Sequence, residues 1–199
     1  YPAKFSVQDN YIYQGRATVK NGDFTVSFIV PRDIDYSFGQ GKISFYAQNG
    51  ITDASGFTRQ FVIGGSGTGN ADNAGPRISL FMDGPDFTDG GTTGDTPLLI
   101  AKLSDESGIN TLRNAIGHDI VATLDGNASS SIVLNSYYNA DLDSFRSGVV
   151  QYKFPQLTEG MHTLTLKAWD VFNNSSEATI RFIVSKDRKI TLTSMNVYP

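Results

Sequence analysis

The side chains best suited to chemistry in this sequence are acidic and amide groups gathered in loops. Asp105 and Glu106 lie in one loop, Asp170 and Asn173 in a second, and Asp72 in a glycine-rich stretch. Ca²⁺ takes about six to eight oxygen ligands of these types, so calcium is the cofactor that we consider, as a brace at a module junction. None of the loops has EF-hand spacing. Because Asp and Asn also dominate β-turns, turn formation is the simpler interpretation.

Two histidines, His118 and His162, are the candidate bases. Nucleophilic hydrolysis needs a nucleophile, a base and an orienting group. Each histidine lies at the start of a predicted strand, and no Gly-x-Ser-x-Gly turn precedes a helix. We interpret both as half-exposed strand histidines and predict no catalytic residue and no enzymatic activity in this chain.

Exposed aromatic residues are a third candidate site, since aromatic rings can stack on a sugar. The pair Tyr137–Tyr138, Tyr36 with Phe38, and Trp169 are the possible platforms. Trp169, however, follows a buried-looking strand, and aromatic residues at the ends of a sandwich often cover the edge of the core. A glycan-binding or adhesin module of an exported bacterial protein is therefore the alternative function.

These side chains must be positioned by strands, because the sequence contains no long helical period. Residues 11–20 and 24–30 flank Asn21–Gly22, a pair that favours a type I′ hairpin turn. Residues 4–7, 43–47 and 57–63 are further strand candidates. The alternating pattern predicts core positions in the first and second halves of the chain: Val26, Phe28, Ile43, Phe45, Phe61, Ile63, Leu164, Leu166, Phe182 and Val184.

Seven strands separated by turn residues are predicted in the second half of the chain. They span residues 78–82, 98–104, 119–124, 131–134, 149–154, 161–169 and 177–184. Seven short strands over about 100 residues favour an immunoglobulin-like or fibronectin-type III-like sandwich. Residues 42–64 also align without a gap on 163–185, which indicates two related modules with the same two strands and the same turn.

The fold class is therefore all-β, with two tandem immunoglobulin- or fibronectin-III-like β-sandwich modules. Residues 1–66 form a partial module, which has either five strands or a partner strand missing, and its open sheet could accept a strand from another segment. Residues 67–76 form a linker rich in Gly, Asn and Asp. Residues 77–185 form the seven-stranded sandwich, and residues 186–199 lead towards a following domain.

Composition narrows the classes of partner. The formal net charge of −4 argues against nucleic acid and anionic membranes, which require clustered Lys and Arg. No stretch approaches the roughly 20 apolar residues of a membrane span. The absence of cysteine excludes disulfides and thiol nucleophiles in this chain. Because Tyr1 is not an initiator Met, we interpret the chain as a processed or excised part of a larger exported protein.

Several blocks of sequence together resemble a known family. The blocks are Gly15–Arg16, Asn21–Phe24, Phe28–Tyr36, Gly41–Ala47, Ser104–Asn110, Ile116–Ile120, Gly160–Leu164 and Ala168–Ser175. In order and number they resemble the region that follows the peptidase domain in PorU-type sortases. These sortases are gingipain-like cysteine peptidases of the Bacteroidetes type IX secretion system.

The resemblance implies a non-catalytic scaffold in a large cell-surface protein. Such a protein removes C-terminal sorting signals from secreted cargo and helps to attach the cargo to anionic lipopolysaccharide. Its catalytic Cys and His would lie upstream of Tyr1, so neither is carried over to this chain. The implied partners are the upstream peptidase domain, a downstream terminal domain that would follow residues 196–199, and other type IX secretion components.

Overall fold

The computed structural model describes residues 11–67, 72–112 and 117–186 of the 199-residue chain. The predicted strand at residues 4–7 and the closing residues 196–199 lie outside this part. The described elements are β1 (Gly39–Gln40), β2 (Ile43–Gln48), β3 (Asp53–Thr58), β4 (Val62–Ile63), β5 (Arg77–Met82), β6 (Thr92–Thr93), β7 (Leu98–Ser104), β8 (Val121–Leu124), η1 (Ala128–Ser130), β9 (Ile132–Val133), η2 (Asn135–Tyr137), β10 (Tyr138–Ala140), β11 (Ser147–Lys153), β12 (Gly160–Trp169) and β13 (Ser175–Val184). The fold is therefore all-β, and no helix among the described residues is long and apolar enough to cross a membrane.

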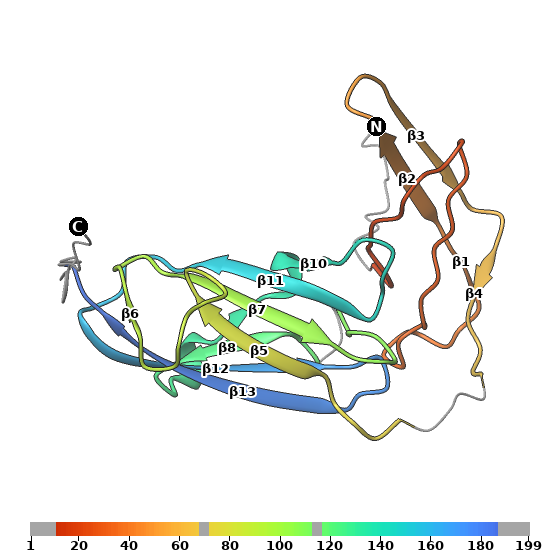
Figure 1. The fold of residues 1–199 in the computed structure, drawn as a ribbon. Helices are drawn as coiled ribbons and strands as arrows, with labels where there is room; N and C mark the ends of the chain where they lie inside the picture. Colours follow the sequence, from red (N-terminus) through yellow and green to blue (C-terminus); the bar gives the residue numbers. More distant parts are fainter. Residues whose placement is uncertain (1–10, 68–71, 113–116, 187–199) are drawn as a thin grey trace, which may run out of the picture.

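Strands β5 to β13 form a β-sandwich of two sheets (Figure 1). One sheet has the order β10-β11-β7-β5, and the other has the order β6-β13-β12-β8-β9. All neighbouring strands are antiparallel except β6, which runs parallel to β13. The longest ladder joins β12 to β13, from Gly160 opposite Val184 to Trp169 opposite Ser175.

The hydrophobic core lies between these two sheets. Along β12 the side chains of Leu164, Leu166 and Ala168 are buried, whereas the residues between them are only partly buried. This period of two is that of a strand with one face towards a core. Leu164, Leu166, Phe182 and Val184, four predicted core residues, are each at most 2% exposed, and they pack in one cluster with residues of β5, β7 and β11.

All seven strands predicted in the second half have a counterpart in the sandwich. They correspond to β5, β7, β8, β9, β11, β12 and β13, with ends that differ by at most two residues. The structure adds β6 and β10, which have two and three residues. Both are too short for an alternating pattern to stand out, whereas β9, which is as short as β6, was predicted within the mostly apolar run of residues 131–134.

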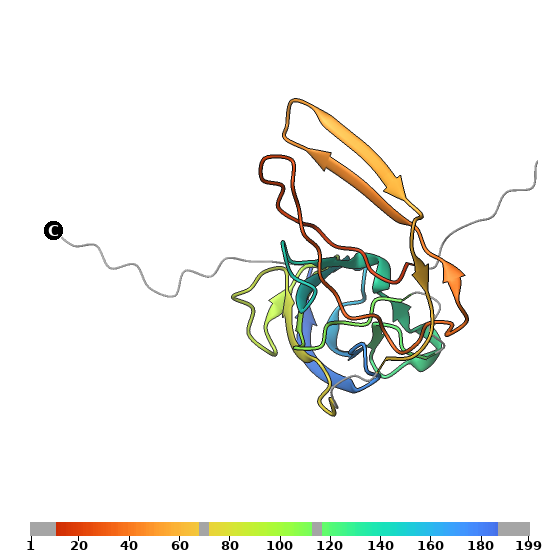
Figure 2. The same cartoon turned by 90° about the vertical axis from the view of Figure 1, so that its right-hand side faces the viewer.

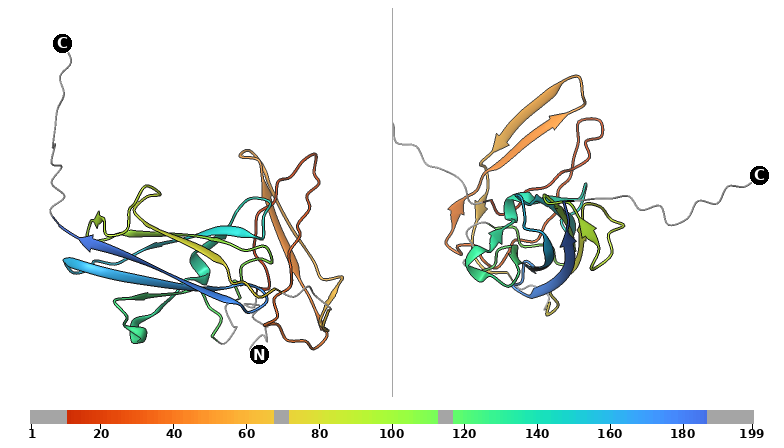
Figure 3. Two further views of the ribbon diagram at one scale, coloured as in Figure 1. Left: turned by 60° about the horizontal axis from the view of Figure 1, so that its bottom comes forward. Right: turned by 90° about the vertical axis from the view of Figure 1, so that its left-hand side faces the viewer.

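Residues 11–63, which we call the N-terminal segment, lie across one end of the sandwich, and the β2–β3 hairpin projects away from it (Figures 1, 2 and 3). The predicted turn is present, with positive φ angles of 54° at Asn21 and 91° at Gly22. Lys20 and Asp23 exchange two backbone hydrogen bonds of 2.9 Å across it. The predicted arms, however, form only this isolated bridge instead of a ladder.

Six of the ten predicted core residues therefore need correction. Val26, Phe28 and Ile43 are 45%, 40% and 42% exposed, and Phe45, Phe61 and Ile63 are only partly buried. The physical reason is the absence of a facing sheet. Within residues 11–67 the strands form two separate two-stranded sheets, β1-β4 and β2-β3, and a sheet of two strands cannot enclose a core.

The predicted repeat is also only partly present. β2–β3 and β12–β13 are both hairpins, as the alignment of 42–64 on 163–185 requires. Ala47 faces Ala54, seven residues on, whereas its counterpart Ala168 faces Ser176, eight residues on. The expectation of the same turn is therefore wrong by one residue. β3 also ends at Thr58, whereas β13 continues to Val184.

Candidate functional site

The N-terminal segment meets the sandwich around the carboxylate of Asp33. Asp33 Oδ2 accepts a hydrogen bond from Asn110 Nδ2 at 2.7 Å and lies 2.7 Å from His118 Nδ1. Asp33 Oδ1 accepts a hydrogen bond from Asn173 Nδ2 at 2.9 Å. Asn110 and His118 both belong to the connection between β7 and β8, and Asn173 belongs to the loop between β12 and β13, so one side chain ties two connections of the sandwich to the segment. We call this arrangement the Asp33 junction.

The Asp33 junction contributes to stability because its members are largely buried. Asn110 is fully buried, and its Oδ1 accepts the backbone N–H of Leu112 at 3.1 Å. The side chain of Asp33 is 13% exposed, and that of His118 is 25% exposed. A buried amide left without a partner costs about 1–3 kcal/mol, and hydrogen bonds to a charged group are stronger than neutral ones. Asp33 thus satisfies a buried donor that water cannot easily reach.

Arg32 reinforces the contact from the neighbouring position. Its backbone N–H donates to the carbonyl of Val171 at 2.9 Å, and its Nη1 donates to the carbonyl of Phe172 at 3.2 Å. The guanidinium carbon lies 4.7 Å from the centre of the Phe172 ring. Two consecutive residues of the segment, Arg32 and Asp33, therefore contact the loop between β12 and β13.

His118 and Trp169 complete the site. The two rings lie 4.3 Å apart between centroids, and Lys167 Nζ lies 5.0 Å from the Trp169 ring. Because His118 and Lys167 contact its ring, Trp169 is partly buried. Its ring is therefore not open as a sugar platform. His118 is partly exposed, as predicted, and its role here is to hold Asp33.

Three acidic side chains meet beside the Asp33 junction. Asp72, Asp105 and Asp170 each place an oxygen within 4.8 Å of the other two. Asp170 is fully buried, and its Oδ1 accepts the backbone N–H groups of Phe172 and Asn174 at 2.9 and 2.7 Å. Burial raises the pKa of Asp105, and the charges of Asp170 and Asp72 raise it further.

This acidic cluster contains three of the five predicted calcium ligands. Glu106 is exposed and lies outside the cluster, and Asn173 donates to Asp33 instead. The oxygens of Asp72, Asp105 and Asp170 are of the kind that bind a hard divalent cation. The same groups also accept hydrogen bonds within their loops, as when Ser107 Oγ donates to Asp72. Calcium binding therefore stays a prediction.

A second contact joins the segment to the turn between β10 and β11. Asp143 accepts hydrogen bonds from the backbone N–H and the hydroxyl of Thr18, both at 2.6 Å. These bonds lower the pKa of Asp143.

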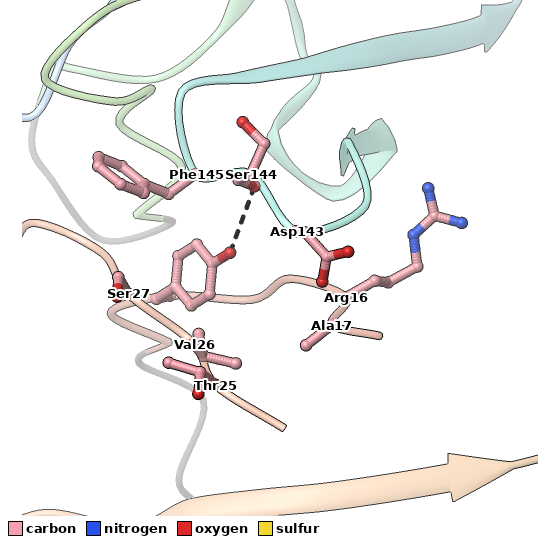
Figure 4. A pocket seen from close by; sticks show the side chains of 9 residues that line it. Arg16, Ala17, Thr25, Val26, Ser27, Asp143, Ser144 and Phe145 are labelled. Carbon is pink, nitrogen blue, oxygen red and sulfur yellow. Dashed lines mark hydrogen bonds between the residues drawn. The ribbon is translucent and has the colours of Figure 1, made fainter. Parts of the chain in front are cut away.

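Beside the Asp143 contact is a cavity of about 140 Å³ (Figure 4), where the hydroxyl of Tyr13 donates to the carbonyl of Ser144 at 3.5 Å. Its lining residues also include Arg16 and Phe145.

The second histidine is far from the first. His162 lies near the start of β12 and Trp169, which contacts His118, lies at its end, so about 20 Å separate them along the strand. Our interpretation of His162 as half-exposed is wrong, since it is only 7% exposed. Its Nδ1 lies 2.7 Å from Asp125 Oδ2, and its Nε2 lies 2.9 Å from the carbonyl of Thr158. The two histidines therefore do not form one site.

The other predicted sugar platforms are not gathered either. The hydroxyl of Tyr138 is buried, and burial raises the pKa of this residue. Tyr137 is 43% exposed and packs edge-on against Tyr152. Tyr36 donates its hydroxyl to the carbonyl of Arg32. These rings serve local packing and hydrogen bonding in different parts of the molecule.

Asp33 and Asp143 are the functional candidates that the sequence did not single out. A signal for Asp33 was present, because it lies in one of the blocks that carry the family resemblance. Blocks 28–36, 104–110, 116–120 and 168–175 all contribute side chains to the Asp33 junction. Their convergence could have been inferred only by supposing that the blocks meet in space.

Comparison with known proteins gives an informative match. The crystal structure of dimeric latent PorU from Porphyromonas gingivalis is 36% identical to this chain, with a TM-score of 0.56. The match covers 84% of this chain and 16% of the PorU chain. The chain therefore corresponds to a PorU-related region, and the matched part makes up about one sixth of the PorU chain. An endo-β-1,4-mannanase from Thermotoga petrophila matches at 10% identity and a TM-score of 0.35, over 55% of this chain and 20% of its own, which supports no argument. No family model and no curated protein matches the chain.

Proposed function

We propose that this chain is the non-catalytic scaffold region of a cell-surface sortase of the type IX secretion system. The observation that carries the proposal is the 36% identity with PorU over 84% of the chain. In this proposal the parent protein is a gingipain-like cysteine peptidase that removes C-terminal sorting signals from secreted cargo and helps to attach the cargo to the cell surface. Its catalytic residues belong to a domain outside this chain.

We also infer that the sandwich is an immunoglobulin-like module. Strand order supports this inference. The sheet β5-β7-β11-β10 corresponds to strands A, B, E and D of a constant-type immunoglobulin domain, and β13-β12-β8 corresponds to G, F and C. Such sandwiches are rigid and present loops at both ends, which suits a spacer that holds other domains at a set distance.

The scaffold role requires that the N-terminal segment keep its position on the sandwich. The Asp33 junction and the Asp143 contact supply two points of attachment, and two points define an orientation better than one. Among the described residues, nineteen large apolar residues are exposed, and fourteen of them belong to the N-terminal segment. Large exposed apolar surface commonly marks an interaction site. We propose that the peptidase domain or the terminal domain of the parent protein covers the part of this surface that lies outside the β2–β3 hairpin.

The proposal is tested on the native polypeptide. An antibody against this chain is used on an immunoblot of cell envelopes from the source organism, and the band is mapped by peptide sequencing. We expect a band far above 21.6 kDa, with a Cys- and His-containing peptidase domain before Tyr1. A small separate protein, or a parent built of sandwiches alone, would contradict the proposal and favour an adhesin.

A second experiment tests the scaffold role itself. Cells that produce the full-length protein with Asp33→Ala should accumulate cargo whose C-terminal signal is uncleaved. Asp35→Ala is the matched control, because Asp35 is exposed and its carboxylate accepts hydrogen bonds from the backbone and the side chain of Ser37, two residues on in the same segment. Normal cargo processing by the Asp33→Ala protein, at normal abundance, would mean that the junction is not needed for the parent protein's activity.

A further inference from the structure

Strand β3 has an outer edge that is open to a further strand. It pairs only with β2, and five of its six residues are exposed. Among the described residues no backbone hydrogen bond reaches the side of β3 that faces away from β2. An edge of this kind is a template for another strand, and proteins that do not use such an edge usually protect it.

The register shows which backbone groups point outward. Asn49 donates to the carbonyl of Thr52 at 3.2 Å, which makes these two a hydrogen-bonded pair at the turn. Hydrogen-bonded and non-hydrogen-bonded pairs alternate along an antiparallel ladder. Ser55, which faces Tyr46, and Phe57, which faces Ser44, therefore belong to non-hydrogen-bonded pairs. Their N–H and C=O groups point away from β2, at the outer edge.

One face of the hairpin beside this edge carries aromatic and cationic side chains, with Asp53 as a carboxylate at the turn end, where it accepts a hydrogen bond from the Tyr46 hydroxyl at 3.3 Å. Tyr46 and Phe57 lie on the same face and are 68% and 66% exposed. Lys42 Nζ and the guanidinium of Arg59 lie 5.3 and 5.7 Å from the centre of the Phe57 ring. Neither cation is paired with a carboxylate in the described structure. Acidic side chains on an added strand would meet these two charges.

The opposite face is apolar. Phe45 and Ile43 of β2 lie on it, opposite Gly56 and Thr58 of β3. A side chain at Gly56 would meet nothing within 4 Å, so this face is open at the middle of β3. A glycine inside a strand often marks close approach of another backbone. Because side chains of a strand alternate between faces, an added strand would place every second residue here.

We propose that the outer edge of β3 binds an extended segment of another protein chain in which apolar residues alternate with acidic ones. The backbone of that segment pairs with Ser55 and Phe57. Its apolar residues cover the face that carries Phe45 and Gly56, and its acidic residues lie on the face that carries Lys42 and Arg59. This mode of recognition is β-augmentation, in which main-chain bonds give affinity and alternate side chains give specificity.

The test uses the whole 199-residue chain and a capped, fluorescein-labelled peptide in which valine alternates with glutamate over the length of β3. Fluorescence anisotropy should show saturable binding that weakens as salt rises. Ser55→Pro should weaken binding by at least about tenfold, because proline removes an outward N–H without removing a bond to β2. Lys42→Glu with Arg59→Glu should weaken it as well.

Ser44→Pro is the matched control, since Ser44 also belongs to a non-hydrogen-bonded pair and its N–H points to the other edge, beyond β2. Its affinity should equal that of the unaltered chain. Equal loss in both proline variants, or equal binding of a valine–lysine peptide, would overturn the proposal. So would an absence of binding, or a dimer seen by light scattering that Ser55→Pro dissociates, which would make a second copy the occupant.

Discussion

The sandwich and the N-terminal segment contain the same strand-forming residues, yet only the sandwich has a core. Phe182 lies on β13 between two sheets and is fully buried, whereas Phe57 lies on β3 and is 66% exposed. Both strands alternate apolar and polar residues over part of their length. The difference lies in the presence of a facing sheet, since burial removes apolar surface from water only when a second layer covers it.

The two regions are consequently held by different forces. Inside the sandwich, apolar packing dominates, at roughly 25 cal/mol per Å² of buried surface. Between the segment and the sandwich, the contacts described are mainly polar: hydrogen bonds to the carboxylates of Asp33 and Asp143, and hydrogen bonds from Arg32 and Tyr13 to backbone carbonyls. Polar contacts of this kind are specific in geometry and modest in energy. A molecule built this way has a stable body and an oriented but separable attachment.

The largest expected effect separates the two phenylalanines. Phe182→Ala should lower the free energy of unfolding of the sandwich by about 3–5 kcal/mol, because it leaves a cavity between the sheets. Phe57→Ala should change it by less than about 0.5 kcal/mol, as exposed positions usually do. Urea unfolding followed by tryptophan fluorescence measures both, through Trp169. Similar losses of unfolding free energy in the two variants would show that a facing sheet does not account for the difference between the two regions.

An intermediate effect concerns pH and the two histidines. Burial lowers the pKa of His162, but the hydrogen bonds with Thr158 and Asp125 outweigh it, and the net pKa is raised. Since the folded-state pKa exceeds the unfolded value of about 6.5, this contribution is fully present below about pH 6.5 and disappears as pH rises through the folded pKa.

His162→Gln should therefore cost roughly 1–2 kcal/mol at pH 6 and progressively less at higher pH. Thermal unfolding at a series of pH values measures the difference. His118→Gln is the comparison variant, because the His118 imidazole contacts the Asp33 carboxylate of the segment, whereas that of His162 contacts groups within the sandwich. A pH-independent difference for His162→Gln would show that the imidazole acts by packing against Phe182 alone.

The smallest effect lies at the border of the two regions. The pKa of Asp105 is raised, so the charged form is disfavoured in the folded state at neutral pH and the cost falls as pH drops through the folded-state pKa. Asp105→Asn should raise Tm by roughly 1–3 °C at pH 7 in the presence of a chelator. The amide oxygen can still accept the N–H groups of Ser107 and Gly108.

The effect of calcium on Tm tests the same acidic cluster. If Asp72, Asp105 and Asp170 hold Ca²⁺, millimolar calcium should raise the Tm of the unaltered chain and not that of Asp105→Asn. Differential scanning calorimetry with calcium and with magnesium measures the shift. An unchanged Tm, together with no heat in isothermal titration, would show that the cluster serves only its turns.

Much of the sandwich is predictable from sequence because its strands carry local signals. Alternation and flanking turn residues located seven of the nine described strands there. The same signals failed at Val26, Phe28 and Ile43, since alternation shows which face is apolar and not whether another layer covers it. Strand β10 was missed because three residues are too few for an alternating pattern to stand out.

The site was less predictable than the fold. Asp33 is separated by 77, 85 and 140 residues from Asn110, His118 and Asn173, and no local pattern reports bonds of such length. The acidic residues were recognised by type, and three of them do meet. Glu106 was included because it adjoins Asp105, but adjacent residues of a loop can point in different directions.

Hydrogen exchange of the intact chain and of Asp33→Ala, followed by mass spectrometry, tests whether Asp33 attaches the segment to the sandwich. We expect amides of the N-terminal segment around Arg32 to lose protection in the variant, whereas those of β7, β12 and β13 keep theirs. Asp35→Ala should exchange like the intact chain. Unchanged protection of the segment, or an equal loss in the sandwich strands, would contradict the view that Asp33 attaches the segment to an independently stable sandwich.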